Sequence, residues 1–253
     1  MTDRALTNFY SQARPGYFYA VGVGAGSADL VTMRAVRIIS SVDVLIAPRS
    51  AKAEYSVARD IVNEYLNAGQ RVIEHVYPMI RNEDETYRAW DKIAEEIEQW
   101  CKEGKSVAQI TLGDPLIYST SSYLLHCLHK RLPRERIRII PGISAFQATA
   151  ALAGEKLTLQ EDRLTIMPAT NLEAVEHALR SCETLVLYKC GGKIRELAEL
   201  LERLELQDRC FLACYAEQGD REFLTRNLNE AIEKMPGYLA TMIIWTGNRK
   251  WNG

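Results

Sequence analysis

Three short glycine-containing segments are the parts of this chain best suited to binding a small molecule. Each follows an apolar run that is typical of a buried strand, and in chain order they are Gly24–Ser27, Gly113–Thr120 and Gly142–Ala145. Glycine lets the main chain approach a ligand or take a positive φ, and Asp114 can accept hydrogen bonds from an amine or a hydroxyl. Ligands of open α/β sheets bind beyond the carboxyl ends of the strands. Together the segments therefore predict a small-molecule site.

The first segment lacks two features of a dinucleotide-binding loop. Its glycines are Gly22, Gly24 and Gly26, whereas the fingerprint needs the third glycine one position later, where this chain has Ser27. Asp43 lies at about the right distance for a ribose ligand, but it opens the next strand instead of closing it. A nicotinamide cofactor is therefore disfavoured.

The histidines and cysteines form no pattern typical of catalysis or of metal binding. His126 and His129 could share a helix face, but no acidic or cysteine partner is near them in sequence, so no protein-bound metal is expected. The six cysteines, at positions 101, 127, 182, 190, 210 and 214, contain no C-x-x-C pair. We expect buried, reduced thiols and a cytoplasmic protein.

Composition and charge exclude several classes of partner. Among the 253 residues, 47% are apolar and 25% are charged, which is ordinary for a globular protein. The net charge of -2 predicts no attraction to nucleic acid or to an anionic membrane, and no apolar run is long enough to span a bilayer. The polar segment 1–16 is interpreted as a terminal tail and not as a secretory signal.

The first part of the chain alternates β-type runs with helical patterns. We expect strands over Tyr17–Gly24, Asp43–Ala47, Arg71–Tyr77, Val107–Leu112 and Arg136–Ile140, and helices over Leu30–Ser41, Val57–Leu66, Asp84–Gly104, Ser119–Lys130 and Ser144–Leu152. Helices of this length between strands predict right-handed crossovers and a mainly parallel sheet covered on both faces. The longest helix carries an apolar stripe that includes Trp90 and Trp100, which we assign to the core, and the acidic residues beside it are interpreted as a solvated face.

The pattern changes after about residue 160. We expect strands over Leu164–Pro168, Thr184–Lys189, Cys210–Ala216, Glu222–Asn227 and Leu239–Trp245, and helices over Leu172–Arg180, Lys193–Leu204 and Leu228–Lys234. The stretch 157–162 has no strong periodicity and is interpreted as a linker. The sequence thus predicts an α/β protein of two domains, over residues 17–158 and 163–253.

These segments carry a resemblance to the tetrapyrrole (corrin and porphyrin) methyltransferases. The resembling residues are Gly22-Val23-Gly24-Ala25-Gly26 with Leu30-Val31-Thr32, then Gly113-Asp114-Pro115, then Pro141-Gly142-Ile143-Ser144-Ala145. In the second part they are Leu185-Val186-Leu187-Tyr188-Lys189 and Ala216-Glu217-Gln218-Gly219. Within the family, Ala47–Lys52, Leu112–Thr120 and Met167–Thr170 are similar to the branch that methylates C20 of precorrin-2.

The resemblance implies two α/β domains with S-adenosylmethionine bound in the cleft between them and released as S-adenosylhomocysteine. It implies a donor site formed by Leu112, Gly113, Asp114, Ile117, Ser144, Ala145, Tyr188, Lys189, Ala216 and Met242. It also implies a homodimer. Two departures concern the first two loops: Ala25-Gly26-Ser27 stands where relatives usually have Pro-Gly-Asp, and Leu112 stands where many have a glycine.

The implied chemistry needs positioning more than an activated protein nucleophile. A sulfonium donor is strongly electrophilic, and alignment of donor and acceptor can lower the barrier by about 7–11 kcal/mol. The acceptor is a macrocycle edged with carboxylates, so we expect cations and hydrogen-bond donors from Arg49, Ser50, Lys52 and Thr120 to hold it. C20 must lose a proton after transfer, and the catalytic group that takes it is not identified. Tyr118 and Asp43 are candidates by placement, and water is another.

Three alternatives remain open on the sequence. The methylated position could be C2 and C7 of uroporphyrinogen III, or a later corrin carbon such as C11 or C17. The acceptor could be metal-free or could contain cobalt, and we favour the cobalt-containing form. A non-catalytic ligand-binding protein is the third alternative, because the Pro and Asp of the first loop are missing.

Overall fold

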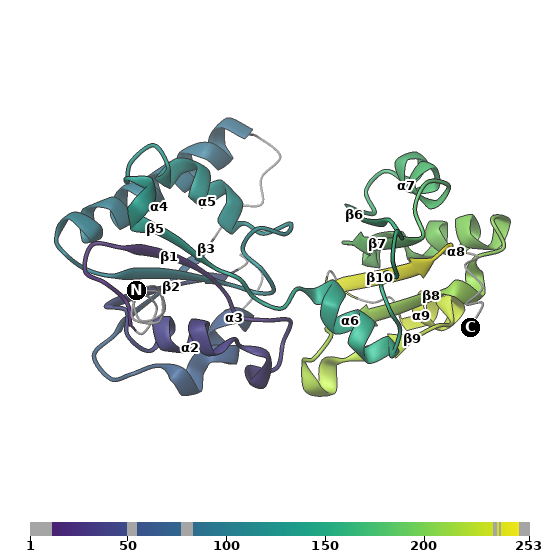
Figure 1. Cartoon of the computed structure of the whole chain (residues 1–253), viewed down its shortest axis with the longest axis horizontal. Helices are drawn as coiled ribbons and strands as arrows, with labels where there is room; N and C mark the ends of the chain where they lie inside the picture. The colour runs from purple at the N-terminus through teal and green to yellow at the C-terminus, as the bar shows by residue number, and fades with distance from the viewer. Residues whose placement is uncertain (1–11, 50–54, 77–82, 235–236, 238, 248–253) are drawn as a thin grey trace. The chain divides into compact units, whose positions relative to one another are not determined.

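Two five-stranded sheets organise the chain, and each belongs to a separate unit (Figure 1). The computed structural model describes residues 12–49, 55–76, 83–234, 237 and 239–247. Contacts divide the chain into Met1–Ser144 and Ala145–Gly253. This division falls before the boundary at 158–163 that the sequence favours, since helix α6 (Ala145–Ala153) packs on strands of the second sheet. The linker at 157–162 stays a prediction.

The first sheet is parallel throughout. Its strands are β1 (Phe18–Gly22), β2 (Val44–Arg49), β3 (Arg71–Val76), β4 (Val107–Thr111) and β5 (Ile137–Ile140), and their order across the sheet is β3-β2-β4-β1-β5. Its helices are α2 (Met33–Ile39), α3 (Val57–Val62), α4 (Glu83–Lys102) and α5 (Ser121–Leu128), with 3-10 turns at Ala28–Leu30, Asn63–Tyr65 and Arg134–Arg136. All five expected strands and their intervening helices are confirmed.

Helices cover both faces of the first sheet. In Figure 1, α4 and α5 lie on one side of it and α2 and α3 on the other. Alternate residues of β1 enter the two cores: Phe18 packs in the core under α4 and α5, whereas Tyr19 packs in the core under α2 and α3. Both side chains are fully buried, as the near-continuous apolar runs of a two-sided parallel sheet predict.

Two of the helices on the first sheet are shorter than their predicted ranges. The helix expected over Leu30–Ser41 begins at Met33, because the hydroxyl of Thr32 accepts a hydrogen bond from the amide of Ala35 at 3.2 Å. The residues before it form a 3-10 turn. The helix expected over Val57–Leu66 ends at Val62 and continues as a 3-10 turn. Both helices are therefore shorter than the apolar periodicity predicts.

The amphipathic helix α4 is confirmed, with one correction. Trp90 is 2% exposed in the core, and Trp100 packs partly buried against the same core. Glu98, however, belongs to the acidic residues that were interpreted as a solvated face, yet only 17% of its side chain is exposed. It pairs with Lys102 at 2.8 Å and with Arg131 at 3.1 Å, so it links α4 to the end of α5.

The second sheet is mixed. Its strands are β6 (Leu164–Pro168), β7 (Thr184–Tyr188), β8 (Cys210–Cys214), β9 (Phe223–Thr225) and β10 (Ala240–Trp245), in the order β6-β7-β10-β8-β9. The last strand, β10, inserts antiparallel between β7 and β8, so those two strands run in the same direction. Its other helices are α7 (Leu172–Leu179), α8 (Ile194–Arg203) and α9 (Leu228–Lys234), with 3-10 turns at Gly191–Lys193, Gln207–Arg209 and Gly219–Arg221.

The faces of the second sheet are covered by different helices. One face packs in a core with α7, α8 and α9, whereas Phe211 and Ala213 on the other face pack with Leu152 and Ala153 of α6. The predicted α/β class with two sheets is confirmed. All six cysteines are buried and free, as expected, and burial raises the pKa of Cys101 to about 12 and those of Cys210 and Cys214 to about 11.

Candidate active site

The carboxyl ends of β1, β4 and β5 meet in direct main-chain contact. A Cβ atom on Gly22, the last residue of β1, would lie 2.5 Å from the carbonyl oxygen of Gly113 and 2.7 Å from the amide nitrogen of Gly142. A Cβ on Gly142 would collide with the same oxygen of Gly113. The three predicted loops are therefore brought together as expected. Gly22 and Gly142 are required by the contact of the loops with one another.

A short bridge ties the first loop to the second. The amide of Gly113 donates a hydrogen bond to the carbonyl oxygen of Gly24 at 2.7 Å, and the two residues form an isolated antiparallel bridge. Both take a positive φ, 82° at Gly24 and 71° at Gly113, which a residue with a side chain adopts only under strain. Gly24 and Gly113 thus use the conformational freedom of glycine, and the bridge between them joins the main chain of the two loops.

Asp114 joins the second loop to the third. Its Oδ1 accepts a hydrogen bond from the amide of Leu116 at 2.9 Å, which closes its own turn, and its Oδ2 accepts one from the amide of Gly142 at 3.1 Å. The side chain is half-buried. A carboxylate has about four lone-pair sites, so Asp114 keeps acceptor capacity while it holds the two loops together.

A polar chain under the second loop orients its far end. The hydroxyls of Thr111 and Ser119 lie 3.0 Å apart, and Ser119 Oγ accepts a hydrogen bond from the amide of Ser121 at 3.1 Å. Ser121 in turn donates to the buried Oε1 of Gln109 at 2.6 Å. Sequence reasoning did not single out Gln109 or Ser121, although a glutamine inside an apolar strand was a signal that a buried partner would be needed.

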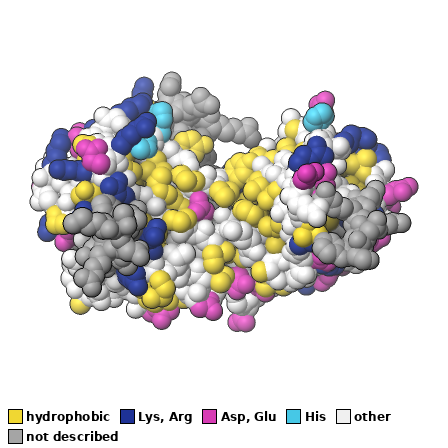
Figure 2. Space-filling view, viewed as in Figure 1, with side chains coloured by type: hydrophobic (Ala, Val, Ile, Leu, Met, Phe, Trp, Pro, Cys, Tyr) yellow, Lys and Arg dark blue, Asp and Glu magenta, His cyan; other side chains and the backbone are white. Residues whose placement is uncertain are grey.

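Exposed apolar side chains accompany this loop. Leu116 is 58% exposed and Tyr118 is 46% exposed, and Tyr118 has a positive φ of 48° although it is not a glycine. Figure 2 shows hydrophobic side chains at the viewed surface of both units. Ile117 and Thr120 are half-buried in the same loop. The loop therefore offers apolar and aromatic surface next to main chain that is rigidly held.

The second unit has three strained residues at the carboxyl ends of β7 and β8. Lys189 directly follows β7 with a φ of 56°, and Tyr215 and Glu217 follow β8 with φ of 51° and 62°. Ala216 lies between the last two and is 7% exposed. Non-glycine residues in this region cost about 1 kcal/mol or more each, and such strain clusters at functional sites. These turns contain the predicted donor residues Lys189 and Ala216.

Contacts hold these turns in place. The amide of Tyr215 donates to the carbonyl oxygen of Leu239 at 2.9 Å, and the guanidinium of Arg221 lies 4.2 Å from the centre of the Tyr215 ring. The predicted donor residue Tyr188 accepts a hydrogen bond through its hydroxyl from the amide of Phe146 at 3.3 Å, in the first turn of α6. Ala145 begins that helix, and Ser144, 2% exposed, precedes it.

Met242 differs from the other predicted donor residues. It lies in the middle of β10, paired with Leu187 on one side and Leu212 on the other, and it is fully buried in the core under α7, α8 and α9. Because its side chain is enclosed by the core, this placement indicates a packing role. We leave Met242 out of the proposed donor site.

Asp43 lies at the amino ends of the strands of the first sheet, directly before β2, whereas the loops follow the carboxyl ends. Its Oδ2 accepts hydrogen bonds from the amide and the hydroxyl of Ser106, at 2.7 Å and 2.8 Å, just before β4 begins. Burial alone would raise the pKa of the Asp43 carboxyl, but these hydrogen bonds outweigh it and hold that pKa below its ordinary value. Asp43 joins the starts of two strands, so its placement does not support a part in proton removal.

Of the predicted acceptor-binding residues, Arg49 is the last residue of β2, at the same edge as the three loops. Its Nε lies 3.5 Å from Glu74 Oε2, and 28% of its side chain is exposed. Ser50 and Lys52 lie outside the described residues.

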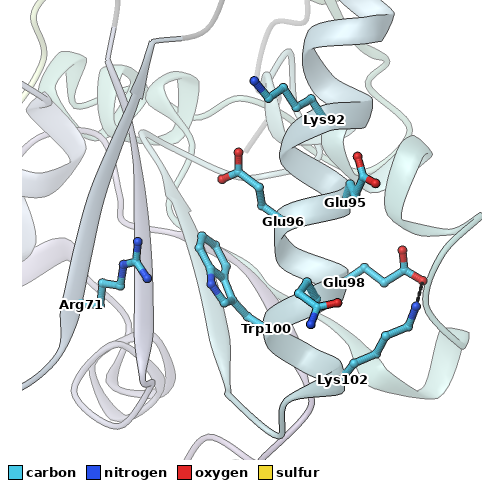
Figure 3. A pocket seen from close by; sticks show the side chains of 8 residues that line it. Arg71, Lys92, Glu95, Glu96, Glu98, Trp100 and Lys102 are labelled. Atoms are coloured by element: carbon cyan, nitrogen blue, oxygen red, sulfur yellow. Dashed lines mark ion pairs between the residues drawn. The ribbon is translucent and has the colours of Figure 1, made fainter.

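A surface pocket of about 550 Å³ lies away from the loops, between β3 and α4. In Figure 3, Arg71 on the strand faces Trp100 on the helix, and the guanidinium lies 5.4 Å from the indole centre. Arg71 is the first residue of β3. The pocket therefore lies toward the amino ends of the strands, where open α/β sheets do not bind their ligands.

The described residues contain neither a metal-binding cluster nor a membrane-spanning helix. Among them, no group of three or more His, Cys, Asp or Glu side chains is arranged to hold a metal ion. None of the helices in these ranges is long and apolar enough to cross a membrane.

Comparison with known proteins agrees with this geometry. A model of the family described as Tetrapyrrole (Corrin/Porphyrin) Methylases matches residues 17–249 of the chain. Among curated proteins, the chain is similar to the cobalt-precorrin-2 C(20)-methyltransferase of Salmonella typhimurium. The two are 33% identical over 238 residues, which cover 93% of this chain and 98% of the relative.

Solved structures show the same fold. A cobalamin biosynthetic enzyme, cobalt precorrin-4 methyltransferase, matches 94% of this chain and 95% of its own with a TM-score of 0.69 and 17% identity. Uroporphyrin-III C-methyl transferase from Thermus thermophilus, complexed with S-adenosylhomocysteine, matches 90% of this chain and 97% of its own with a TM-score of 0.61 and 19% identity.

Proposed function

Because the chain belongs to the tetrapyrrole (corrin/porphyrin) methylase family, we propose that it transfers a methyl group from S-adenosylmethionine to C20 of precorrin-2 or of its cobalt-containing equivalent. The observation that carries the ring position is the similarity to a C(20)-methyltransferase over nearly the full length of both chains. The meeting of three loops at the carboxyl edge of a parallel sheet supports a small-molecule site in the same residues that carry the family resemblance.

The donor site that we propose consists of residues at strand ends. They are Leu112, Gly113, Asp114, Ile117, Ser144, Ala145, Tyr188, Lys189 and Ala216. The fit is supported by the strained turns at Lys189 and Ala216, and by Asp114, whose carboxylate is held in place and can accept from an amine. When bound, S-adenosylmethionine supplies an electrophilic methyl group. The protein's part is to orient and to exclude water, which its rigid main chain and apolar loop surface favour.

The acceptor is held by residues beyond the donor loops. We propose that Arg49 binds a carboxylate of the macrocycle and that Thr120 lies at the same part of the site. The carbon nucleophile is the ring itself, and C20 loses a proton after transfer. Tyr118 is a candidate by placement to accept or relay that proton, because it lies on the second loop and is 46% exposed. Water is the alternative acceptor.

The test is product analysis with labelled donor. Purified protein is incubated with precorrin-2 or its cobalt form and with S-adenosylmethionine carrying a carbon-13 methyl group, and the product is examined by mass spectrometry and carbon NMR. Label at the C20 meso carbon supports the proposal. Labelled product from uroporphyrinogen III, offered in a parallel assay, would move the activity to C2 and C7, and label at C11 or C17 would move it to a later corrin carbon.

Donor binding is a separate and simpler measurement. We expect calorimetric titration with S-adenosylhomocysteine to give a measurable dissociation constant. No heat of binding at millimolar ligand would end the proposal. Binding of donor and acceptor without turnover would instead identify a non-catalytic binding protein.

We favour the cobalt-containing acceptor, in line with the name of the Salmonella relative. The metal would arrive inside the macrocycle, so the protein needs no metal site of its own. Parallel assays with metal-free and cobalt-containing acceptor decide this point, and a large preference for the metal-free form would refute it.

The assembly that we propose is a homodimer, the commonest form of soluble oligomer. Sedimentation velocity measures it directly. We also propose a cytoplasmic location, which is supported by the six free, buried thiols.

A further inference from the structure

Arg49 and Arg59 both pair with Glu74 near the carboxyl ends of β2 and β3. The three loops described above follow strand ends on this same side of the sheet. Arg59 Nη1 donates to Glu74 Oε1 at 2.9 Å, and Arg49 Nε lies 3.5 Å from Glu74 Oε2. Each oxygen of the glutamate thus faces a different guanidinium. Arg59, unlike Arg49, was not singled out by its sequence surroundings.

Register and capping explain why these three side chains meet. In the parallel pair of β2 and β3, Glu74 is opposite Ala47 and Arg49 is opposite Val76. Because alternate residues point to opposite faces, Glu74 and Arg49 lie on the face that α3 covers. Arg59 comes from the first turn of α3, which begins where Ser56 Oγ accepts a hydrogen bond from the Arg59 amide at 3.3 Å.

Arg59 has more donors than its contact with Glu74 uses. Its guanidinium carries about five N–H donors, and the hydrogen bond to Glu74 is made by Nη1. The side chains of Arg49, Arg59 and Glu74 are 28%, 43% and 21% exposed, so the glutamate is the most enclosed of the three and the arginines remain accessible.

We propose that Arg59 is a second acceptor-binding residue, which together with Arg49 binds a carboxylate of the tetrapyrrole, and that Glu74 is a positioning residue for the two guanidiniums. This inference rests on the proposed function. It is supported by place, since β2 is the direct neighbour of β4 in the sheet and β4 leads into the Gly113–Thr120 loop. Paired planar guanidiniums suit a carboxylate, which they can grip through two parallel hydrogen bonds.

The chain contains a cluster of the same composition that serves as a matched control. Glu176 on α7 pairs with Arg180 at 2.7 Å and with Arg203, at the end of α8, at 2.8 Å. Here the arginines are more exposed, 63% and 58%, and the cluster joins α7 to α8 in the second unit. Variants of this cluster therefore measure the effect on the kinetic constants of losing an arginine–glutamate cluster outside the proposed site.

The first experiment compares Arg59→Ala, Arg59→Lys and the control Arg203→Ala in steady-state kinetics with S-adenosylmethionine and cobalt-factor II, the cobalt-containing equivalent of precorrin-2. We expect Arg59→Ala to raise the KM for the acceptor about tenfold or more while kcat and the KM for the donor stay within about twofold. Arg59→Lys should recover part of the loss, because it keeps the charge without the planar fork. Arg203→Ala should change none of the three constants. An unchanged acceptor KM in Arg59→Ala would overturn the inference.

Glu74→Gln tests the positioning role. Without the glutamate, two like charges lose their shared anchor and separate, so the acceptor KM should rise about threefold or more at physiological salt and should depend more steeply on salt concentration. The effect should be smaller in the Arg59→Ala background, since only the contact of Glu74 with Arg49 then remains. If Glu74→Gln left the acceptor KM unchanged or lowered it, the glutamate would not position the arginines. The matched variant Glu176→Gln should leave the acceptor KM unchanged.

A binding measurement separates this inference from the proposed function. If the wild type makes no methylated product, absorbance titration with cobalt-factor II still compares wild type with Arg59→Ala. Weaker binding by Arg59→Ala, with wild-type affinity for S-adenosylhomocysteine, would support the carboxylate site even though the ring position had failed. Equal acceptor binding by the two proteins would overturn the inference whatever the reaction proves to be.

Discussion

In both units, the loops at the carboxyl ends of the strands contain residues in the left-handed conformation, but the residue types differ. In the first unit, the left-handed positions of the bridge between loops are glycines, Gly24 and Gly113, and Tyr118 is the exception farther along. In the second unit, the left-handed positions after β7 and β8 include three non-glycine residues, Lys189, Tyr215 and Glu217. The contact between the first two loops is therefore made by unstrained glycines, whereas the turns of the second unit carry more strained residues.

The difference shows what determines the conformation of the loops in each unit. Gly22 and Gly142 leave room for neighbouring main chain, so contact among the loops requires them. Lys189 and Glu217 satisfy no such requirement, and a left-handed side chain persists only when its surroundings impose it. At Glu217 the amide donates to Glu222 Oε2 at 2.6 Å, one of the contacts that impose the turn. This strain is the reason that we place donor-binding residues at the ends of β7 and β8 in the proposed function.

The largest expected effect is at the packed edge. Gly22→Ala places a methyl group 2.5 Å from one main-chain atom and 2.7 Å from another, and main chain cannot rotate away as a side chain can. We expect a loss of about 3 kcal/mol or more in the free energy of unfolding, measured by urea denaturation. Gly192→Ala, where nothing lies within 4 Å of the added Cβ, is the control and should be near neutral. A Gly22→Ala protein of wild-type stability would show that the loops can move apart.

Asp114→Ala should have the next largest effect. It removes two charge-assisted hydrogen bonds to the amides of Leu116 and Gly142, each worth about 1.5–3 kcal/mol. We expect lower stability and about tenfold weaker binding of S-adenosylhomocysteine in calorimetry, with the proposed dimer intact in sedimentation velocity. The opposite result, a split dimer with donor affinity unchanged, would make Asp114 purely structural and our placement of the donor site wrong.

At the strained edge the sign should reverse. Lys189→Gly relieves the left-handed strain, and after the entropy that glycine adds to the unfolded chain we expect a gain of about 0.5 kcal/mol in thermal unfolding. If the strain serves the donor, the same variant should bind S-adenosylhomocysteine more weakly. Glu205→Gly, at a φ of 55° in the turn after α8, is the matched control and should gain stability without losing donor affinity. If Lys189→Gly bound S-adenosylhomocysteine as tightly as Glu205→Gly does, the strain at Lys189 would have no role in donor binding.

The smallest expected effect is on the loss of stability at low pH. Hydrogen bonds from Arg203 and Arg180 lower the pKa of Glu176 from its ordinary 4.5 to about 2. Because the folded pKa is the lower one, the stabilisation is complete above about 4.5 and is lost as the pH falls toward 2. Glu176→Gln should therefore flatten the fall of the melting temperature over this window, by a small amount since the pair is exposed to solvent. An unchanged acid profile would show that the ion pairs contribute nothing to stability.

Much of the fold could be read from the sequence because its signals are local. Each expected strand and helix exists, and Leu164–Pro168 and Leu228–Lys234 match to the residue. Apolar runs, helical stripes and glycine turns depend on neighbours along the chain. The start of α2 differed from the predicted position because Thr32 caps the helix with a hydrogen bond. The family resemblance rests on the same contiguous segments, which is why it too was visible.

The candidate site was predictable only in part. The three loops could be placed at one edge because parallel strands end together. That Asp43 would instead tie strand starts through Ser106, and that Met242 would lie inside the core, depends on register and on the insertion of β10 between β7 and β8. Such pairings join residues far apart in sequence.

The sequence by itself determined the order and type of the elements, the glycines of the loop edge and the family. Tertiary structure alone decided that Gly22 and Gly142 contact each other's loops, that strain lies on Lys189, and that Arg49, Glu74 and Arg59 form one cluster. The physical reason is that local propensity acts over a few residues, whereas strand order, register and shared counter-ions are set by packing between segments that the chain brings together only when it folds.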